Sequence, residues 1–158
     1  MEYKGKRSPA GEILTGLILD IFRLSSLLST AGDRLVARLE LTSARWQILG
    51  AIAAAERPEP VAWLARNMGA NRQNVQRIVN DLHKRGLVAF EVNPHHRRAQ
   101  LVVLTDKGKQ AFDSAMRVQA PWVNELSDGL PTKDLQTVRH VIATLRKRLE
   151  RNGSEERS

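Results

Sequence analysis

The sequence predicts a mainly α-helical protein that carries one small β-hairpin. Apolar residues recur at intervals of three and four over most of the chain, and they alternate every second residue only within 87–104. The 158 residues are 42% hydrophobic and 27% charged, which suffices for one compact domain. Cysteine is absent, which excludes disulfides, thiolate metal sites and catalytic thiols.

Two helices are expected in the first sixty residues. The first spans 12–39, because a seam of apolar side chains runs along it at Leu14, Leu17, Ile21, Leu24, Leu28, Ala31 and Leu35. Thr42 can cap the second helix, which carries Trp46 and ends before Pro58.

A shorter pair of helices follows. One spans 61–68 and ends at Gly69, a residue that tolerates the left-handed backbone at a helix end. Asn71 can cap the next helix, over 72–85. The tight turn between the two helices is typical of a helix-turn-helix.

The pattern then changes to two strands, at 87–92 and 101–104, joined by a turn that Asn93 and Pro94 open. The order of short helix, turn, second helix and hairpin is the layout of a winged helix-turn-helix. In that fold the second helix enters the major groove of DNA.

The helix over 72–85 has an apolar face, formed by Val75, Ile78, Val79 and Leu82, and an opposite polar face. Amides and cations on the polar face suit base edges and phosphates. A solvated helix face is the alternative interpretation. We predict DNA contacts from Asn71, Arg72, Gln73, Asn74, Gln76, Arg77, Asn80 and Lys84.

The turn of the hairpin favours the DNA-binding interpretation, because it clusters His95, His96, Arg97 and Arg98. Turn geometry does not require these residues, and gathering cations costs repulsion unless they meet a polyanion. Arginines of such a wing can enter a minor groove. Residues 61–109 carry nine Lys and Arg against three Asp and Glu, which is six of the chain's eight net positive charges. We therefore add His96, Arg97 and Arg98 to the predicted DNA contacts.

Several short motifs, in this order and spacing, resemble the MarR (multiple antibiotic resistance regulator) family of transcription regulators. They are VAWLARNMG at 61–69, ANRQNV at 70–75, HKRGLV at 83–88, HRRA at 96–99 and LTDKG at 104–108. The resemblance spans roughly residues 10–150. It implies a winged helix-turn-helix DNA-binding protein in which Arg98 matches the wing arginine.

The wing departs from the family at one point. The family usually carries an Asp just before the wing arginines, where it would brace one of them, and this chain has His95 and His96 there. Protonation of His96 would instead raise wing affinity at mildly acid pH. Binding that stays flat between about pH 6 and pH 8 at fixed salt would contradict this hypothesis.

Two helices are expected after the hairpin. Thr105 can cap the first, over 106–128, which Pro121 should kink or split. The second spans 132–151, with an apolar seam at Leu135, Val138, Ile142, Leu145 and Leu149. The seams of the first and last helices are too long for one small core, and heptad-like seams pack against other helices.

The resemblance implies a two-fold dimer that places two reading helices ~34 Å apart on a pseudo-palindromic operator. We expect 10–40 and 106–151 to form a helical dimerisation region, and 42–105 to form the DNA-binding lobe. Residues 1–9 and 152–158 should be flexible tails.

In the family, small aromatic compounds bind between the dimer helices and the DNA-binding lobe. Trp46 and Trp122 are candidates to line such a cavity, although each is also a reasonable core aromatic. Trp63 is expected to face the core of the helix-turn-helix. No cofactor or metal site is expected.

The sequence thus predicts a ligand-responsive transcription regulator, most simply a repressor. A non-specific architectural DNA-binding protein is the alternative. It would lack the preference of roughly 10³ or more that a regulator has for its site. An enzyme is not expected, since no Gly-rich phosphate loop, HExxH or GxSxG is present. With no visible secretion signal and no apolar run near the ~20 residues of a membrane span, we expect a cytoplasmic protein without a membrane partner.

Overall fold

The computed structural model describes residues 5–155 and confirms the predicted fold class: 72% of it is helical, with one small antiparallel sheet. The elements in order are α1 (Pro9–Val36), the 3-10 turn η1 (Ala37–Leu39), α2 (Ser43–Ala54), β1 (Glu59–Pro60), α3 (Val61–Met68), α4 (Arg72–Lys84), β2 (Val88–Glu91), β3 (Leu101–Leu104), α5 (Asp106–Leu126) and α6 (Thr132–Glu155). They form two compact units that divide after Gln119.

The local signals for helix ends operate as predicted. The side-chain oxygens of Thr42, Asn71 and Thr105 each accept a hydrogen bond from the backbone N–H three residues later, at 3.0–3.2 Å. Each cap satisfies a donor that has no partner inside its helix. Gly69 ends α3 with φ 62°, a left-handed conformation in which a Cβ would be strained.

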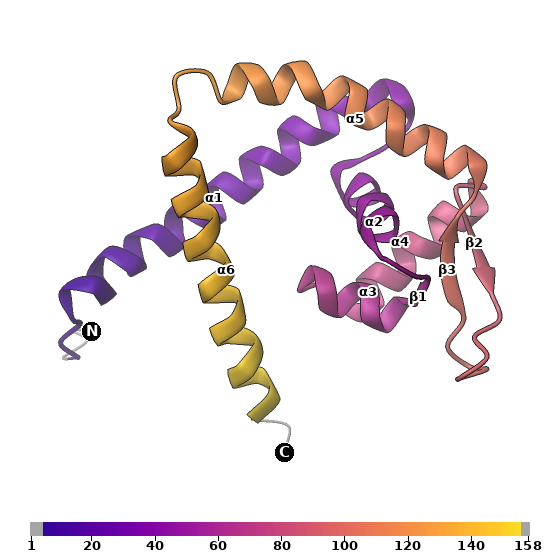
Figure 1. Ribbon diagram of the computed structural model, residues 1–158, viewed down its shortest axis with the longest axis horizontal. Coiled ribbons are helices and arrows are strands. Elements are labelled where there is room, and N and C mark those ends of the chain that lie inside the picture. The colour runs from indigo at the N-terminus through magenta and orange to yellow at the C-terminus, as the bar shows by residue number, and fades with distance from the viewer. Residues whose placement is uncertain (1–4, 156–158) are drawn as a thin grey trace. The chain divides into compact units, whose positions relative to one another are not determined.

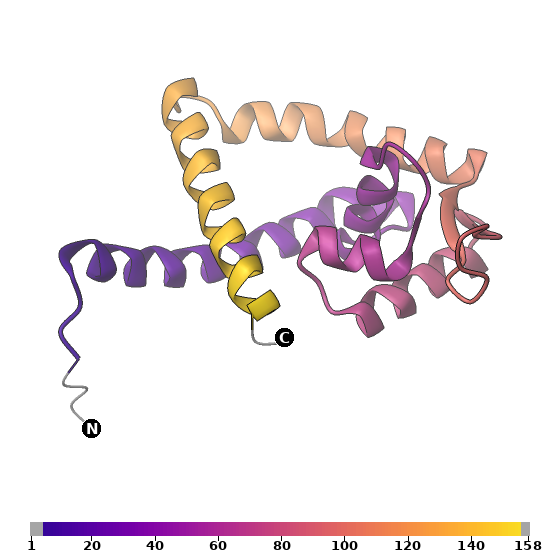
Figure 2. The same ribbon diagram turned by 60° about the horizontal axis from the view of Figure 1, so that its bottom comes forward.

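The core of the first unit lies between the helices of the helix-turn-helix and the sheet. Figures 1 and 2 show α2, α3 and α4 crossing one another beside the β2–β3 hairpin. All four predicted apolar residues of α4 are buried there. They pack in a cluster with Ile48 and Leu49 of α2 and Leu64 of α3. This packing fixes which face of α4 points outward.

The sheet has three strands, one more than the sequence analysis predicted. β1 pairs with β3 in antiparallel register, with Glu59 opposite Val102 and Pro60 opposite Leu101, and β3 pairs with β2. At this point the sequence predicts only that the second helix ends before Pro58. A two-residue strand at the sheet edge accommodates Pro60, because an edge position does not need every N–H.

Trp63 is a correction to the expected core. It is 48% exposed, because Val61, Leu64 and Ala65 occupy the inward face of α3 at helical spacing and leave Trp63 between them on the outer side.

The last two helices differ from the expectation at their ends: α5 stops at Leu126, before the predicted end at 128, and α6 extends past its predicted end at 151. α5 continues through Pro121 without a break, although the division between the two units falls beside this proline. α6 continues to Glu155, so Asn152 and Gly153, expected to begin a tail, are helical. The parts of the expected tails at 1–4 and 156–158 lie outside the described residues.

Helix α1 corrects the expectation that no segment reaches the length of a membrane span. Pro9–Leu39 contains an 18-residue window with mean hydropathy 1.5, none of it buried, which suffices by length and composition alone. Asp20 interrupts the apolar run, so no uninterrupted run reaches the length of a span, but α1 carries apolar side chains beside the seam as well. The large apolar side chains of α1 that are exposed, on the seam and beside it, are Ile13, Leu17, Ile18, Leu19, Phe22, Leu24, Leu27 and Leu28.

Candidate nucleic-acid interface

Helix α4 presents the polar face that the sequence predicts. Gln73, Arg77, Asn80 and Lys84 are exposed, and Gln76 is half-buried. Asn71 caps the helix, and exposed Arg72 follows it. The first turn therefore offers both free N–H groups and a cation, a combination that suits a phosphate.

Two side-chain hydrogen bonds order this face along the helix. Gln76 Nε2 donates to Asn80 Oδ1 at 2.9 Å, and Arg77 Nη2 donates to Asn74 Oδ1 at 2.8 Å. Asn74 lies away from the most outward positions, and its contact with Arg77 suits it to orient that guanidinium. Both bonds are exposed and local, so base edges can replace them at small cost.

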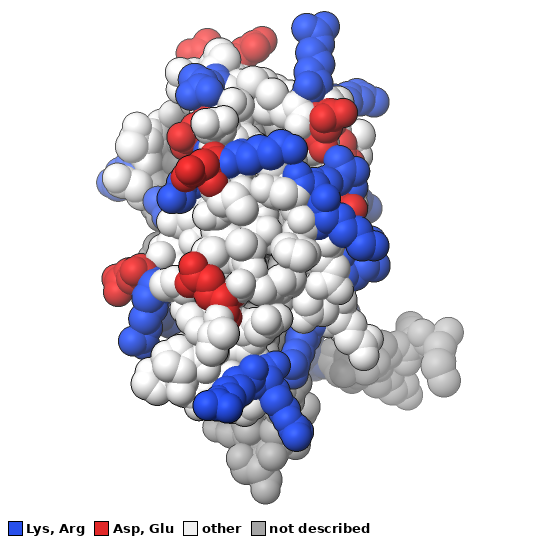
Figure 3. Space-filling view, turned by 90° about the vertical axis from the view of Figure 1, so that its right-hand side faces the viewer, with Lys and Arg blue, Asp and Glu red and all other residues white. Residues whose placement is uncertain are grey.

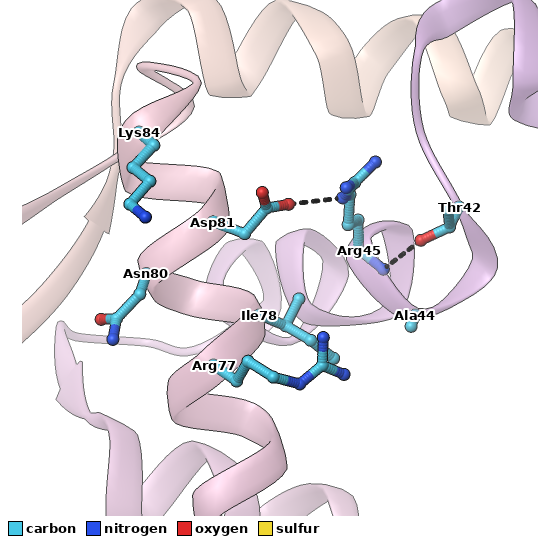
Figure 4. Close-up of a pocket in the computed structure, with 8 residues that line it drawn as sticks. All are labelled: Thr42, Ala44, Arg45, Arg77, Ile78, Asn80, Asp81 and Lys84. Carbon is cyan, nitrogen blue, oxygen red and sulfur yellow. Dashed lines mark hydrogen bonds and ion pairs between the residues drawn. The ribbon is translucent and has the colours of Figure 1, made fainter.

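The single acid on α4, Asp81, is turned toward two arginines. Asp81 Oδ2 lies 2.7 Å from Arg45 Nε of α2 and 3.3 Å from Arg85 Nε. Figure 4 shows Asp81 pointing from α4 toward Arg45, while Asn80 and Lys84 project from the other side of the helix. The carboxylate that would repel phosphate is thus neutralised within the protein.

An open groove lies between α4 and the N-terminus of α2, with a volume of about 530 Å³. Arg45, Arg77 and Lys84 line it together with Asp81 (Figure 4). Arg45 is paired with Asp81, and the cations that line the groove outnumber this one acid, so the groove carries a net positive charge that favours an anion.

A second groove, of about 200 Å³, lies between α4, the predicted recognition helix, and the β2–β3 hairpin, the predicted wing. Arg72, Gln76 and Asn80 of α4 line it, and so does Arg98 of the hairpin turn. The structure therefore brings residues predicted separately, from the helix wheel and from the turn, to one surface. They lie about twenty residues apart in the chain.

Asn93, which the sequence predicts only as one of the residues that open the turn, holds the hairpin turn together. Asn93 is 8% exposed. Its Nδ2 donates to the Ala99 carbonyl oxygen at 3.0 Å, and its Oδ1 accepts from the His95 N–H at 3.0 Å. One buried amide thus holds both sides of the loop that carries exposed His96, Arg97 and Arg98. The available signal was the residue type, because an Asn at a turn commonly hydrogen-bonds the backbone two residues later.

Positive side chains gather on the face of the molecule that carries the hairpin. In Figure 3, Lys and Arg form a band along one edge of this face and a further group at its lower end, where the β2–β3 loop lies, with acids scattered between them. This distribution agrees with the charge excess of residues 61–109.

The two candidate effector tryptophans belong to different units. Trp46 packs, half-buried, against the core of the first unit, and Trp122 is half-buried in the second. Their joint role in an effector cavity stays a prediction. Among residues 5–155, no group of three or more His, Asp and Glu is placed to hold a metal ion.

The fold and this surface define a winged-helix DNA-binding protein. A family model described as the MarR family matches residues 39–99. An uncharacterized protein of Mycobacterium bovis is 37% identical over 126 residues, which cover 80% of this chain and 87% of that protein. The chain belongs to the MarR family of transcription regulators.

Other relatives carry functional descriptions. The transcriptional activatory protein BadR of Rhodopseudomonas palustris is 28% identical over 107 residues, covering 65% of this chain and 59% of BadR. The transcriptional repressor CouR, bound to a 23-mer DNA duplex, has a TM-score of 0.72 and 23% identity, over 89% of this chain and 99% of CouR. CouR from Rhodococcus jostii bound to p-coumaroyl-CoA has a TM-score of 0.72 and 19% identity, over 89% and 95% of the two chains. At these identities the two structures establish the fold.

Proposed function

We propose that the chain is a sequence-specific, ligand-responsive transcription regulator, most simply a repressor, which binds a pseudo-palindromic operator as a homodimer. The observation that carries this proposal is the groove shared by Arg72, Gln76, Asn80 and the wing residue Arg98. A helix that reads bases and a wing that reaches the flanking groove need to act on one stretch of duplex.

Within this proposal the polar residues divide the work of recognition. Arg77, Gln73 and Gln76 contact bases, because guanidinium and amide groups pair with guanine and adenine edges. Asn74 orients Arg77, at 2.8 Å. Arg72, Lys84, Arg97 and Arg98 neutralise phosphates or enter the minor groove, and supply most of the affinity.

The homodimer accounts for the apolar side chains that the lone chain exposes. The described part of α1 carries eight large exposed ones, and α6 carries Leu135, Val138, Val141, Ile142 and Leu149. Exposed apolar area on this scale marks an interface. We propose that 10–40 and 106–151 form the dimerisation region around a DNA-binding lobe at 42–105. A cytoplasmic dimer also covers the apolar face of α1 without a membrane.

The effector is proposed to be a small aromatic compound. Support comes from the CouR structure that holds p-coumaroyl-CoA. Trp46 and Trp122 stay the residues proposed to contact the effector. The relative BadR is described as an activatory protein, so activation is the alternative to repression.

Selection of bound DNA from a random pool tests the proposal. The expected result is one two-fold repeat with half-sites about 10 bp apart, preferred over random DNA by roughly 10³ or more. A non-specific architectural protein would return no common motif, and that outcome would replace the proposal with the alternative.

A further inference from the structure

Ser43, the first residue of α2, bonds to α1 where α1 enters the core. Its hydroxyl donates to the Ser29 carbonyl oxygen at 2.7 Å, and its backbone N–H donates to Asp33 Oδ1 at 2.7 Å. Ser43 is 7% exposed, so water competes weakly for these bonds. Two directional bonds at one residue therefore hold α2 against α1.

Gly32 makes this contact possible. Gly32 is buried, and a Cβ built on it would overlap with Ser43 Oγ. The absence of a side chain lets the hydroxyl reach the backbone of α1. We call Ser29, Gly32, Asp33 and Ser43 the α1–α2 latch.

The α1–α2 latch lies where the exposed part of α1 meets the rest of the first unit. From Pro9 to Ala31 no residue of α1 is buried, and Figures 1 and 2 show this part of the helix projecting from the lobe. Pro9–Ser29 is about 30 Å long at 1.5 Å per residue. A tilt of about 6° at the latch would displace the far end by roughly 3.4 Å, the rise of one base pair.

The same end of α2 also holds the recognition helix. Arg45, two residues after Ser43, forms the 2.7 Å bond to Asp81 of α4. Short polar contacts thus run from α1 through Ser43 and Arg45 to α4, and the packing of α2 against α4 accompanies them.

We propose that Ser43 is a positioning residue that sets the half-site spacing accepted by the dimer. It does so by fixing the angle between α1, which carries part of the proposed dimer interface, and the recognition helix α4. The inference rests on the proposed function and extends it from base reading to spacing. Ser43 itself touches no DNA in this scheme.

The experiment uses the full chain and duplexes that carry the selected half-sites at the selected spacing, at one and two base pairs more or fewer, or one half-site alone. Wild-type affinity should fall by about tenfold or more for a shift of one base pair. Ser43→Ala should reduce that penalty to about threefold or less, while its affinity for the single half-site stays within about twofold of wild type.

Thr30→Ala is the matched control. It removes a hydroxyl one residue from Ser29 that bonds only within α1, to the Ser26 carbonyl oxygen at 3.1 Å, and it should keep the wild-type spacing profile. The Gly32→Ala/Ser43→Ala variant guards against a loss of packing. Its new methyl group occupies the place of the hydroxyl, 3.4 Å from the Cβ of residue 43, so it should fold and should also tolerate altered spacing.

The possible results separate the inference about Ser43 from the proposed function. A sharp wild-type profile retained in both Ser43 variants overturns the inference, as does an equal loss of affinity for every duplex. A wild-type protein that prefers one half-site sequence but no spacing overturns the inference and leaves the proposed function standing. A wild-type protein that selects no sequence overturns both.

Discussion

Arg45 and Asp81 lie 36 positions apart in the chain and meet through a 2.7 Å bond between Nε and Oδ2. The pair joins α2 to the recognition helix, and Arg85 adds a second cation 3.3 Å from the same oxygen. The side chains of Arg45 and Asp81 are only 22% and 38% exposed. This contact ties α4 to α2 and turns the one acid of α4 toward two arginines.

Asp81→Asn should therefore destabilise the protein while it strengthens non-specific DNA binding. Loss of the partly shielded ion pair should lower the free energy of unfolding by about 1 kcal/mol, and removal of a negative charge near the duplex should raise affinity for random DNA. Urea denaturation and titration of random duplex measure the two effects. Asp113→Asn removes the same charge from an exposed position on α5. Equal stability of the two variants would contradict a role for the Arg45–Asp81 pair.

Arg77→Ala should weaken operator binding by about 1–3 kcal/mol and relax the preference at one base position, because it removes a proposed base contact. Lys84→Ala on the same helix should instead weaken binding to all sequences alike. It should also reduce the slope of log affinity against log salt by about one. Binding titrations on operator and single-base variants, over a range of salt, separate the two. If Arg77→Ala lowered affinity for every sequence by the same factor, Arg77 would be a phosphate contact.

Arg98→Ala should weaken binding to all sequences and flatten the slope of log affinity against log salt by about one. The wing arginine is exposed in the groove that it shares with α4, so its removal should leave the fold intact. Arg117→Ala, an exposed arginine on α5, is the charge-matched control. An unchanged slope in Arg98→Ala would remove the wing from the interface.

Asn93→Ala should weaken DNA binding through the wing arginine, since it leaves the Ala99 carbonyl and the His95 N–H without the amide that holds them. In an Arg98→Ala background the same substitution should cost little more. A double-mutant cycle on affinity measures this coupling, and thermal denaturation checks that the rest of the protein folds. Fully additive losses would show that Asn93 acts independently of Arg98.

Phe22→Asp should convert the proposed dimer into a folded monomer. Phe22 is 68% exposed in the single chain, so an aspartate costs the monomer little, but burial of that charge in an interface is costly. Sedimentation measures the oligomeric state, and circular dichroism measures helix content. Arg23→Gln, at the neighbouring exposed position, should stay dimeric. A Phe22→Asp protein of unchanged mass in solution would place the interface elsewhere.

Local sequence sufficed to predict the helices, the caps at Thr42, Asn71 and Thr105, and the outward residues of α4. Hydrophobic periodicity and side-chain capping act over a few residues, so both can be read without knowledge of the fold. The basic turn was predictable for a similar reason, since its cations are neighbours in the chain. These signals predict the winged helix-turn-helix, which the structure confirms, and a DNA-binding surface, which stays a prediction.

The tertiary structure alone decided the contacts that position this surface. Three of them are the pairing of β1 with β3, the Arg45–Asp81 bond and the contact of Ser43 with Gly32. Each joins residues whose neighbouring sequence gives no sign of the partner. Trp63 lies outside the core because Val61, Leu64 and Ala65 occupy the inward face of α3. Such outcomes depend on which surfaces meet when the elements pack, and a single element's sequence does not encode the shape of its partner.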